Sequence, residues 1–283
     1  MKILKIISII AAVSILFYAC EKIEPPFKEN PDTPEPPDTT TVLKKVLLED
    51  YTGHDCVNCP SAAVVAEDLK ELYGERLIVM AVHAGFFARP KADMPQDFRT
   101  DAGEAWDQFF GVSAAGNPNG LVNRVERSEG DYIFNVGEWG TTIAAEMAKE
   151  PEAKITIDNS FAQNKLTSNI TSEFVTPLNG TYNLLYCITQ DSIIGPQMNN
   201  DDNVGDTPKI ENYVFMHMLR YTNSSWGEKL TDDNPVVVGE EYEIEITVDF
   251  ETDWVPKDCH VVAFIFDTEK KTIIQVEEAK VIE

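Results

Sequence analysis

The sequence predicts two folded parts in series, an α/β layer fold over residues 42–150 and an all-β antiparallel sandwich over residues 151–283. In the first part, apolar runs typical of strands alternate with stretches of helical periodicity, which favours parallel pairing at the centre of a sheet. In the second part, apolar and polar residues alternate in seven segments separated by turn residues, as in sandwiches of antiparallel strands.

A short apolar segment precedes the two folded parts. Lys2 and Lys5 give it a positive start, and the apolar run over residues 6–18 is too short to span a bilayer comfortably. Residues 1–19 are therefore interpreted as a cleaved signal peptide. Cys20 follows a small residue at the end of this run, where a bacterial lipoprotein is cleaved and acylated. The alternative is an ordinary secreted protein with an incidental cysteine.

Residues 20–41 are expected to form a tether behind the lipidated cysteine. The segment contains six of the 16 prolines of the chain, among acids and threonines, and has almost nothing apolar to bury. Pro-rich segments of this composition are semi-rigid and mostly extended. We expect the tether to hold the folded parts at a distance from a lipid anchor.

The expected elements of the first part alternate between strands and helices. Residues rich in Val and Leu predict a strand at 42–48, and an apolar run predicts a strand buried on both faces at 77–82. A third strand is expected at 121–125. Apolar residues at helical spacing, with Gly74 as a stop signal for the first helix, predict helices at residues 61–73, 95–110 and 135–149.

The expected strands of the second part lie at residues 154–158, 166–175, 182–190, 213–221, 242–250, 260–267 and 272–281. A long irregular stretch over residues 195–212 interrupts them, and loops of this length are commonly functional or disordered. Cys187 and Cys259 fall within expected strands, and sequence leaves open whether they form a disulfide or stay buried as thiols. His217, in an apolar strand, is expected to be a core polar group with its hydrogen bonds satisfied.

The charge of the chain excludes one class of partner. The chain has 48 acidic and 23 basic residues, which gives a formal net charge of −25. A surface of this sign repels nucleic acids and anionic lipid headgroups, so no nucleic-acid partner is expected.

The most informative motif is Cys56-x-x-Cys59, which follows a strand and a turn and opens a predicted helix. A thiol at a helix N-terminus faces unpaired backbone N–H groups and the positive end of the helix dipole, which lower its pKa. Asp55 puts a negative charge beside Cys56 and opposes this effect.

Three interpretations of the cysteine pair remain open. As a redox dithiol, Cys56 attacks a substrate disulfide and Cys59 resolves the mixed disulfide. As a structural disulfide, the pair fastens the start of the helix in an oxidising compartment. As half of a zinc site, it would need His54 and His83 as further ligands. Haem attachment is excluded because Pro60 stands where that motif requires histidine, and no cofactor or metal is expected.

His83 ends the apolar run that predicts a central strand. Because α/β sheets place their sites at the carboxyl ends of such strands, we expect His83 near the dithiol, where it could exchange a hydrogen bond with a thiol. The alternative is a histidine with a structural hydrogen bond.

The first part resembles the thioredoxin fold. The order of strand, turn, Cys-x-x-Cys and helix fits, and Asp50, six residues before Cys56, corresponds to the buried acid that moves protons at the second cysteine of thioredoxins. The segment around Pro118 resembles the cis-proline loop that lies against the dithiol, so a cis bond is expected there. The sequence departs from thioredoxins at Asp55, which replaces a tryptophan.

A wider resemblance is carried by residues 48–60, 82–85, 213–220 and 261–267, of which the pattern Thr-Gly-x-x-Cys-x-Asn-Cys-Pro is the most specific. In these stretches the chain is similar to the 28-kDa outer-membrane-protein-related lipoprotein family of Bacteroidetes. Membership implies a protein anchored by lipid in the outer membrane of the cell envelope, with a thioredoxin-like domain followed by an immunoglobulin-like sandwich.

Two functions are compatible with these patterns. In the first, the protein exchanges disulfides with envelope proteins, and its site residues are Cys56, Cys59, Asp50, Pro118 and His83. In the second, the protein is a non-enzymatic surface adhesin or ligand-binding lipoprotein that contacts host surface ligands, and the cysteine pair is a structural disulfide.

Overall fold

The computed structural model describes residues 42–282. The expected signal peptide at residues 1–19, the expected lipidated Cys20 and the tether at residues 20–41 lie outside the described residues. No helix within residues 42–282 combines the length and apolar character needed to cross a membrane. The chain from Val42 onward forms one unit.

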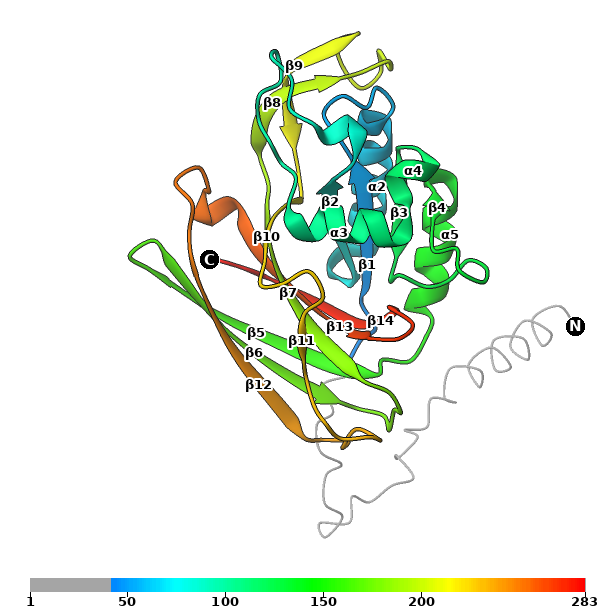
Figure 1. Cartoon of the computed structure of the whole chain (residues 1–283), viewed down its shortest axis with the longest axis vertical. Coiled ribbons are helices and arrows are strands. Elements are labelled where there is room, and N and C mark those ends of the chain that lie inside the picture. The colour runs from blue at the N-terminus through cyan, green and yellow to red at the C-terminus, as the bar shows by residue number, and fades with distance from the viewer. Residues whose placement is uncertain (1–41, 283) are drawn as a thin grey trace, which may run out of the picture. The chain divides into compact units, whose positions relative to one another are not determined.

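Strands from both parts of the chain share one nine-stranded sheet, in the order β14-β13-β7-β10-β2-β1-β3-β4, with β11 paired to β7 (Figure 1). The strands of the first part are β1 (Val46–Thr52), β2 (Leu77–His83), β3 (Asn119–Val122) and β4 (Phe134–Asn135). Those of the second part are β7 (Tyr182–Gln190), β10 (Met218–Thr222), β11 (Glu228–Lys229), β13 (Cys259–Asp267) and β14 (Ile273–Lys280). The two groups meet where β10 pairs in parallel with β2, at Met218 and Ala81. The expected boundary after residue 150 therefore separates two groups of strands that pair with each other.

Helices cover both faces of the strands in the first part. They are α2 (Cys59–Tyr73), α3 (Asp101–Phe110), α4 (Val112–Ala115) and α5 (Val136–Met147), with short 3₁₀ turns at Gly74–Arg76 and Phe86–Ala88. On one face, Leu48 and Val79 belong to an apolar core with Trp139 of α5. On the other face, Trp106 of α3 packs over Met80 and its neighbours. β1 pairs in parallel with β2 and antiparallel with β3, so β1 lies between them at the centre of this group.

Several expected boundaries in the first part were wrong. The strand expected at 121–125 is β3, which begins at Asn119 and ends at Val122. The helix expected over residues 95–110 begins only after Thr100, because the Thr100 hydroxyl accepts a hydrogen bond from the Gly103 N–H at 3.0 Å and caps the helix. The strand expected at 42–48 extends further along the chain, which places Asp50 inside β1.

In the second part, a three-stranded antiparallel sheet packs against β7, β10, β13 and β14. Its strands are β5 (Ala153–Ala162), β6 (Lys165–Phe174) and β12 (Glu241–Asp249), in the order β12-β6-β5. Side chains of β7 alternate between two apolar cores: Tyr186 faces the three-stranded sheet, while Leu185 joins the core under α3. The chain is thus a mixed α/β protein with large sheets and few helices. The expected fold class agrees with the structure in this broad description.

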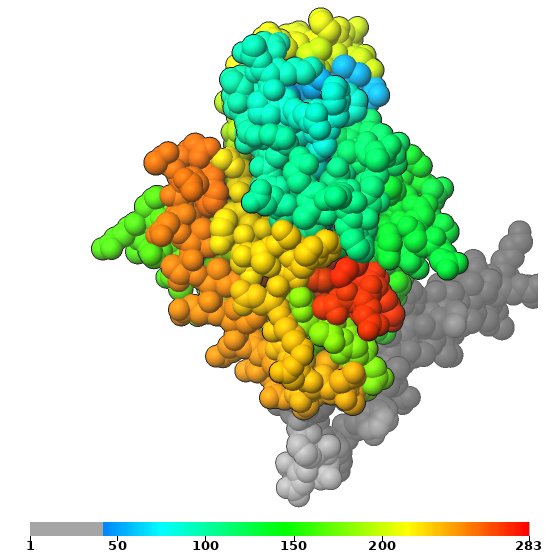
Figure 2. Space-filling model, in the orientation of Figure 1, coloured from blue at the N-terminus to red at the C-terminus, as the bar shows by residue number. Residues whose placement is uncertain are grey.

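The two parts also meet through aromatic side chains near the surface. The rings of Phe109, in α3, and Trp226, between β10 and β11, lie 5.2 Å apart in an edge-to-face arrangement. On the face drawn in Figure 2, segments of the first part in cyan and green adjoin the yellow segment that follows β10.

The irregular stretch expected over residues 195–212 contains most of a hairpin. Its strands are β8 (Ile193–Met198) and β9 (Lys209–Phe215), and we call residues 193–215 the β8–β9 arm. The single strand expected at 213–221 was wrong, because His217 has a φ of 55° and this left-handed conformation breaks it. The chain before the break forms β9 in the arm, and the chain after it forms β10 in the large sheet.

Cys187 and Cys259 are free thiols, and both are buried. Cys187 lies opposite Val262 and Cys259 opposite Gln190, so the two cysteines are not paired across β7 and β13. Of the two possibilities left open by the sequence, the structure therefore has buried thiols.

Candidate functional site

The Cys-x-x-Cys motif lies at the start of α2, at the end of the sheet where β1 finishes. Cys56 and Cys59 form a disulfide, with their Cα atoms 5.4 Å apart. α2 begins at Cys59, and Pro60 in its first turn has no N–H that would be left without a partner. Both cysteines are only 2% exposed. The disulfide therefore lies beneath the surface of the described chain.

The loop that carries Cys56 is held closely against the turn after β2. The Asp55 N–H donates to the Phe87 carbonyl oxygen at 3.0 Å, and the Cys56 N–H donates to the Gly53 carbonyl oxygen at 2.9 Å. A Cβ atom on Gly53 would lie 2.4 Å from the Phe87 carbonyl carbon. The backbones of the cysteine loop and of the turn after β2 can therefore come this close only with glycine at position 53. The Asp55 carboxylate forms an ion pair with Lys91, which offsets part of the negative charge that the sequence places beside Cys56.

Asp50 lies near the end of β1, at the end of the sheet where the Cys-x-x-Cys motif is found. Its side chain is buried, and Oδ1 has no hydrogen-bond partner among the described residues. Burial raises the pKa of Asp50 to about 7, because the carboxylate loses its hydration. A carboxyl with this pKa gains and loses a proton near neutral pH. Asp50 and Cys59 line the same pocket.

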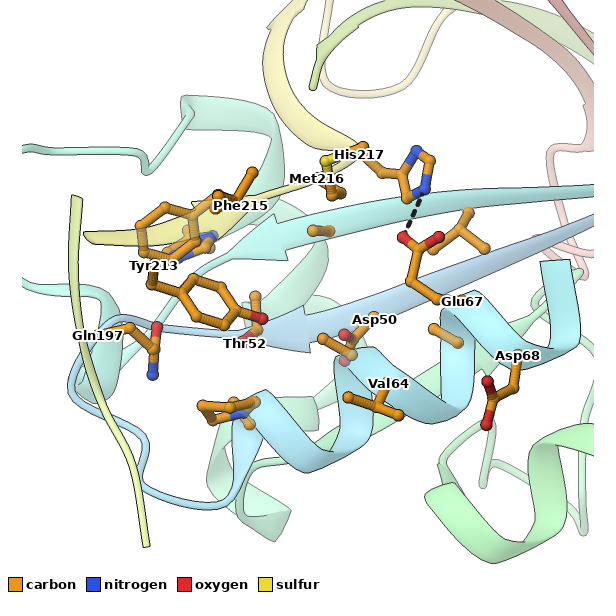
Figure 3. A pocket seen from close by; sticks show the side chains of 18 residues that line it. Asp50, Thr52, Val64, Glu67, Asp68, Gln197, Tyr213, Phe215, Met216 and His217 are labelled. Atoms are coloured by element: carbon orange, nitrogen blue, oxygen red, sulfur yellow. Dashed lines mark ion pairs between the residues drawn. The ribbon is translucent and has the colours of Figure 1, made fainter. Parts of the chain in front are cut away.

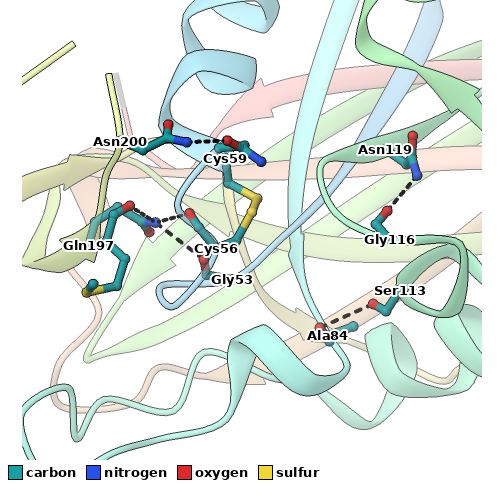
Figure 4. The surroundings of a disulfide bond; sticks show 11 residues. Gly53, Cys56, Cys59, Ala84, Ser113, Gly116, Asn119, Gln197 and Asn200 are labelled. Atoms are coloured by element: carbon teal, nitrogen blue, oxygen red, sulfur yellow. Dashed lines mark hydrogen bonds between the residues drawn. A yellow bond between two sulfur atoms is a disulfide. The ribbon is translucent and has the colours of Figure 1, made fainter. Parts of the chain in front are cut away.

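Pro118 belongs to a segment on the opposite side of the disulfide from the arm. The Asn117–Pro118 bond is cis, as expected. The adjoining β3 pairs with β1, with Gly120 opposite Asp50. Figure 4 shows Gly116 and Asn119 on one side of the disulfide and Gln197 on the other.

His83 is the last residue of β2 and lines the same pocket as Asp50 and Cys59. Burial, together with the nearby His54, lowers the pKa of His83 to about 3, so the ring is neutral. Neither ring nitrogen has a hydrogen-bond partner in the described part of the chain. The ring contacts Phe98 and Phe215, with centroid distances of 5.4 and 5.7 Å. His83 therefore lies near the dithiol without a hydrogen bond to it.

Three of the residues expected for a zinc half-site have other partners. Cys56 and Cys59 are joined in the disulfide, and His54 Nε2 lies 3.0 Å from the Arg89 carbonyl oxygen. Among residues 42–282, no group of three or more His, Cys, Asp or Glu side chains has an arrangement that could hold a metal ion.

The β8–β9 arm covers the cysteine loop, a contact that the sequence did not reveal. Gln197 Nε2 donates to the Cys56 carbonyl oxygen at 3.0 Å. The backbone N–H groups of Met198 and Asn200 donate to the carbonyl oxygens of His54 and Val57 at 2.8 and 3.1 Å. Figure 4 shows Gln197 and Asn200 beside the disulfide. The unusual length of the stretch between expected strands was its only signal in the sequence.

The two ends of the arm, next to Asp191 and His217, are linked to α2 by ion pairs. His217 Nδ1 lies 3.2 Å from Asp191 Oδ1, and His217 Nε2 lies 2.9 Å from Glu67 Oε1 (Figure 3). Burial lowers the pKa of His217, but the hydrogen bonds to Asp191 and Glu67 outweigh it and raise the pKa to about 9. His217 is therefore a positively charged, paired group at neutral pH, and it joins both ends of the arm to the helix that carries Cys59.

A pocket of about 210 Å³ lies behind Cys59, between α2 and β9. Its floor is formed by β1 and β2, and Tyr213, Phe215 and Val64 contribute to its walls (Figure 3). The pocket brings Asp50, His83 and Cys59 together, whereas Pro118 does not line it.

A family model described as Outer membrane protein Omp28 matches residues 104–283, which is more than half of the chain and begins after the Cys-x-x-Cys motif. The structure of HBP35 of Porphyromonas gingivalis is similar to this chain, with a TM-score of 0.64 at 18% identity over 84% of this chain and 76% of that one. This likeness shows a shared fold.

Two further structures are less similar. A protein of Agrobacterium tumefaciens has a TM-score of 0.49 at 11% identity, over 86% of this chain and 96% of its own. A domain of the outer membrane lipoprotein Omp28 from Porphyromonas gingivalis has a TM-score of 0.32 at 15% identity, over 46% of this chain and 88% of its own. No protein with curated annotation matches the chain. The family match confirms the resemblance inferred from the sequence and the expected location at the outer membrane: the chain belongs to the Omp28 family of outer membrane proteins.

Proposed function

We propose that this outer membrane protein exchanges disulfides with other proteins of the cell envelope through Cys56 and Cys59. In this proposal, residues 42–150 are a thioredoxin-like unit and residues 151–283 an immunoglobulin-like sandwich. A lipid anchor on Cys20 and the tether behind it hold both at the membrane, as family membership suggests.

The observation that carries the proposal is the buried carboxyl of Asp50, whose Oδ1 has no hydrogen-bond partner within residues 42–282, in the pocket that Cys59 lines. An unpaired buried carboxyl destabilises a fold, so its presence there favours a chemical use. A group with a pKa of about 7 can give a proton to a neighbouring sulfur and take it back at neutral pH.

The exchange begins from the disulfide form. A thiolate of the partner protein attacks Cys56 Sγ, which breaks the Cys56–Cys59 bond and forms a mixed disulfide. The Cys59 thiolate that leaves takes a proton from Asp50. The second thiol of the partner then loses its proton and attacks the partner sulfur of the mixed disulfide, and the Cys56 sulfur leaves and takes up a proton. The partner dithiol has become a disulfide, and the disulfide of this protein has become a dithiol.

The other two site residues have supporting parts in the proposal. The segment with Pro118 borders the disulfide on the side away from the arm and offers backbone for a partner chain. The neutral ring of His83 adds to the low polarity around Asp50 and does not transfer protons, since its pKa of about 3 keeps it uncharged.

Equilibration with glutathione buffers tests the proposal. We expect a reduction potential between about −270 and −180 mV, the range of thioredoxins and disulfide isomerases. A Cys59→Ser variant with its Cys56 thiol reduced should hold a mixed disulfide with a model peptide that carries a disulfide, because Cys56 attacks that disulfide and no Cys59 thiol is present to release the peptide. A Cys56→Ser variant, the matched control, should not. A pair that stays oxidised below about −300 mV would contradict disulfide exchange.

A second function is favoured by the 2% exposure of both cysteines beneath the arm. In this alternative, the disulfide fastens the start of α2, and the protein acts as a non-enzymatic surface adhesin or ligand-binding module. Replacing both cysteines with serine should then lower the free energy of unfolding by about 2–4 kcal/mol. Binding of the protein to host cells should persist in the folded fraction.

A further inference from the structure

The pocket behind Cys59 has the composition of a small binding site. Val64, Ala81 and Phe215 give it apolar surfaces (Figure 3). Its sheet residues come from β1 and β2, and β3 lies on the other side of β1. Its volume of about 210 Å³ equals roughly seven water molecules at ~30 Å³ each. Mostly apolar pockets with a few convergent polar groups are the usual form of small-molecule sites.

Two unpartnered polar side chains line this pocket. Asp50 is 4% exposed and His83 is 2% exposed. Asp50 Oδ1 and both His83 ring nitrogens lack hydrogen-bond partners among residues 42–282. Buried polar groups are nearly always hydrogen-bonded, so each of these atoms is expected to have a partner other than the residues that the structure describes. Two such groups at the edge of one cavity point to a ligand.

We propose that this pocket binds a small, uncharged and mostly apolar molecule, about the size of one substituted six-membered ring, whose carbonyl oxygen accepts hydrogen bonds from Asp50 and His83. The site does not depend on disulfide exchange, because it uses neither sulfur as a reactant.

The charges around the pocket explain why the ligand is uncharged. Glu67 and Asp68 at the pocket are acidic and disfavour anions, although Glu67 is paired with His217. The neutral His83 ring offers no charge to a ligand. A cation would have to leave water for apolar walls with Asp50 as its only buried counter-charge.

The protonation of Asp50 determines how the site responds to pH. The titratable groups at the pocket are Glu67 and Asp68 on α2, His83 on β2, Tyr213 on β9, and His217 after it. Protonated Asp50 donates a hydrogen bond to a carbonyl oxygen, whereas the carboxylate repels that oxygen. Since the pKa of Asp50 is about 7, binding of a ketone should weaken above neutral pH.

Titration of the folded unit, residues 42–283, with acetophenone tests the proposal, with binding followed by protein NMR. We expect one site and a dissociation constant that rises about tenfold per pH unit above pH 7. Asp50→Asn retains a donor and loses the titration, so it should bind acetophenone with little dependence on pH.

Two variants that fill the pocket complete the test. Ala81→Leu and Val64→Trp each place a larger side chain at a residue that lines the pocket, so each should abolish binding. Circular dichroism identifies a variant that does not fold, and the other variant then serves as the test. Leu72→Trp, on an exposed part of the same helix as Val64, is the matched control and should bind like the wild type. No binding of acetophenone at pH 6, or unchanged binding in a folded pocket-filling variant, overturns the proposal. So does preferential binding of benzylamine above pH 7, which would assign the site to cations.

Discussion

The side-chain amide of Gln197 donates a hydrogen bond to the Cys56 carbonyl oxygen at 3.0 Å, although the two residues are 141 positions apart in the chain. This contact joins the β8–β9 arm to the loop that carries the disulfide. Because Cys56 is 2% exposed, a thiol in solution can reach its sulfur only after a local movement of the structure. We expect movement of the arm to provide this access.

Removing this contact should speed reduction of the disulfide. One buried hydrogen bond contributes about 1 kcal/mol, so Gln197→Ala should raise the population of the open arm and the rate of reduction by dithiothreitol about fivefold. Gln108→Ala, at an exposed position of α3, is the control and should react like the wild type. Equal rates in all three proteins would show that the arm does not limit access.

The titration of His217 should make the stability of the protein depend on pH. Its pKa is raised from 6.5 to about 9, so the charged form stabilises the fold fully below pH 6.5, and this contribution is lost as the pH rises through 9. His217→Gln should lower the free energy of unfolding by on the order of 2–3 kcal/mol at pH 6 and by much less at pH 10. Urea unfolding at both pH values measures this difference. A deficit in His217→Gln that is the same at both pH values would rule out the charged group as its cause.

Asp50 should also make stability fall as the pH rises, but over a lower pH range than His217. Its pKa is raised from 3.8 to about 7, so the folded protein keeps a proton that the unfolded chain has lost between these pH values. Stability therefore falls between pH 4 and pH 7 and stays lower above that range. Relative to Asp50→Asn, the wild type should lose roughly 2–4 kcal/mol of unfolding free energy from pH 4 to pH 8.

The control for Asp50 is Asp158→Asn, at an exposed position of β5. Its stability should follow that of the wild type at every pH. Parallel curves for the wild type and Asp50→Asn would mean that the buried carboxyl titrates like one in water.

The buried ion pair between Glu49 and Arg124 should be sensitive to removal of either partner. Both side chains are fully buried, and the guanidinium donates to the two carboxylate oxygens at 2.7 and 2.8 Å and lies 4.7 Å from the Trp106 ring. Arg124→Met leaves a buried carboxylate unpaired and should cost about 3–5 kcal/mol of unfolding free energy. The double variant with Glu49→Leu should recover most of this loss. If it recovers none, packing of the guanidinium against Trp106 matters more than charge.

The local pattern of the sequence was enough to locate most elements of the fold. The apolar run before His83 is buried on both faces as β2, and the alternation in residues 182–190 corresponds to β7. The place of the cysteines at the start of α2 was also predicted from nearby residues, because the motif follows a strand and a turn and precedes a stretch of helical periodicity. These features depend on side chains a few residues apart.

Contacts between distant segments were not predictable in the same way. Residues 195–212 were expected to be irregular because their strands have little apolar alternation, and the β8–β9 arm binds the cysteine loop partly through backbone groups that every residue has. The left-handed conformation of His217, which directs the chain from the arm into β10, is uncommon for a residue other than glycine.

The sequence by itself determined the succession of strands and helices, the resemblance to the family and the place of Cys56 and Cys59 at a helix start, because these depend on the spacing of side chains along the chain. Only the tertiary structure decided that β2 and β10 join the two parts in one sheet, that the arm covers the disulfide, and that a pocket opens between Asp50 and Phe215. The physical reason is that strand pairing and cavity shape depend on which distant surfaces meet, and the spacing of residues along the chain does not specify those partners.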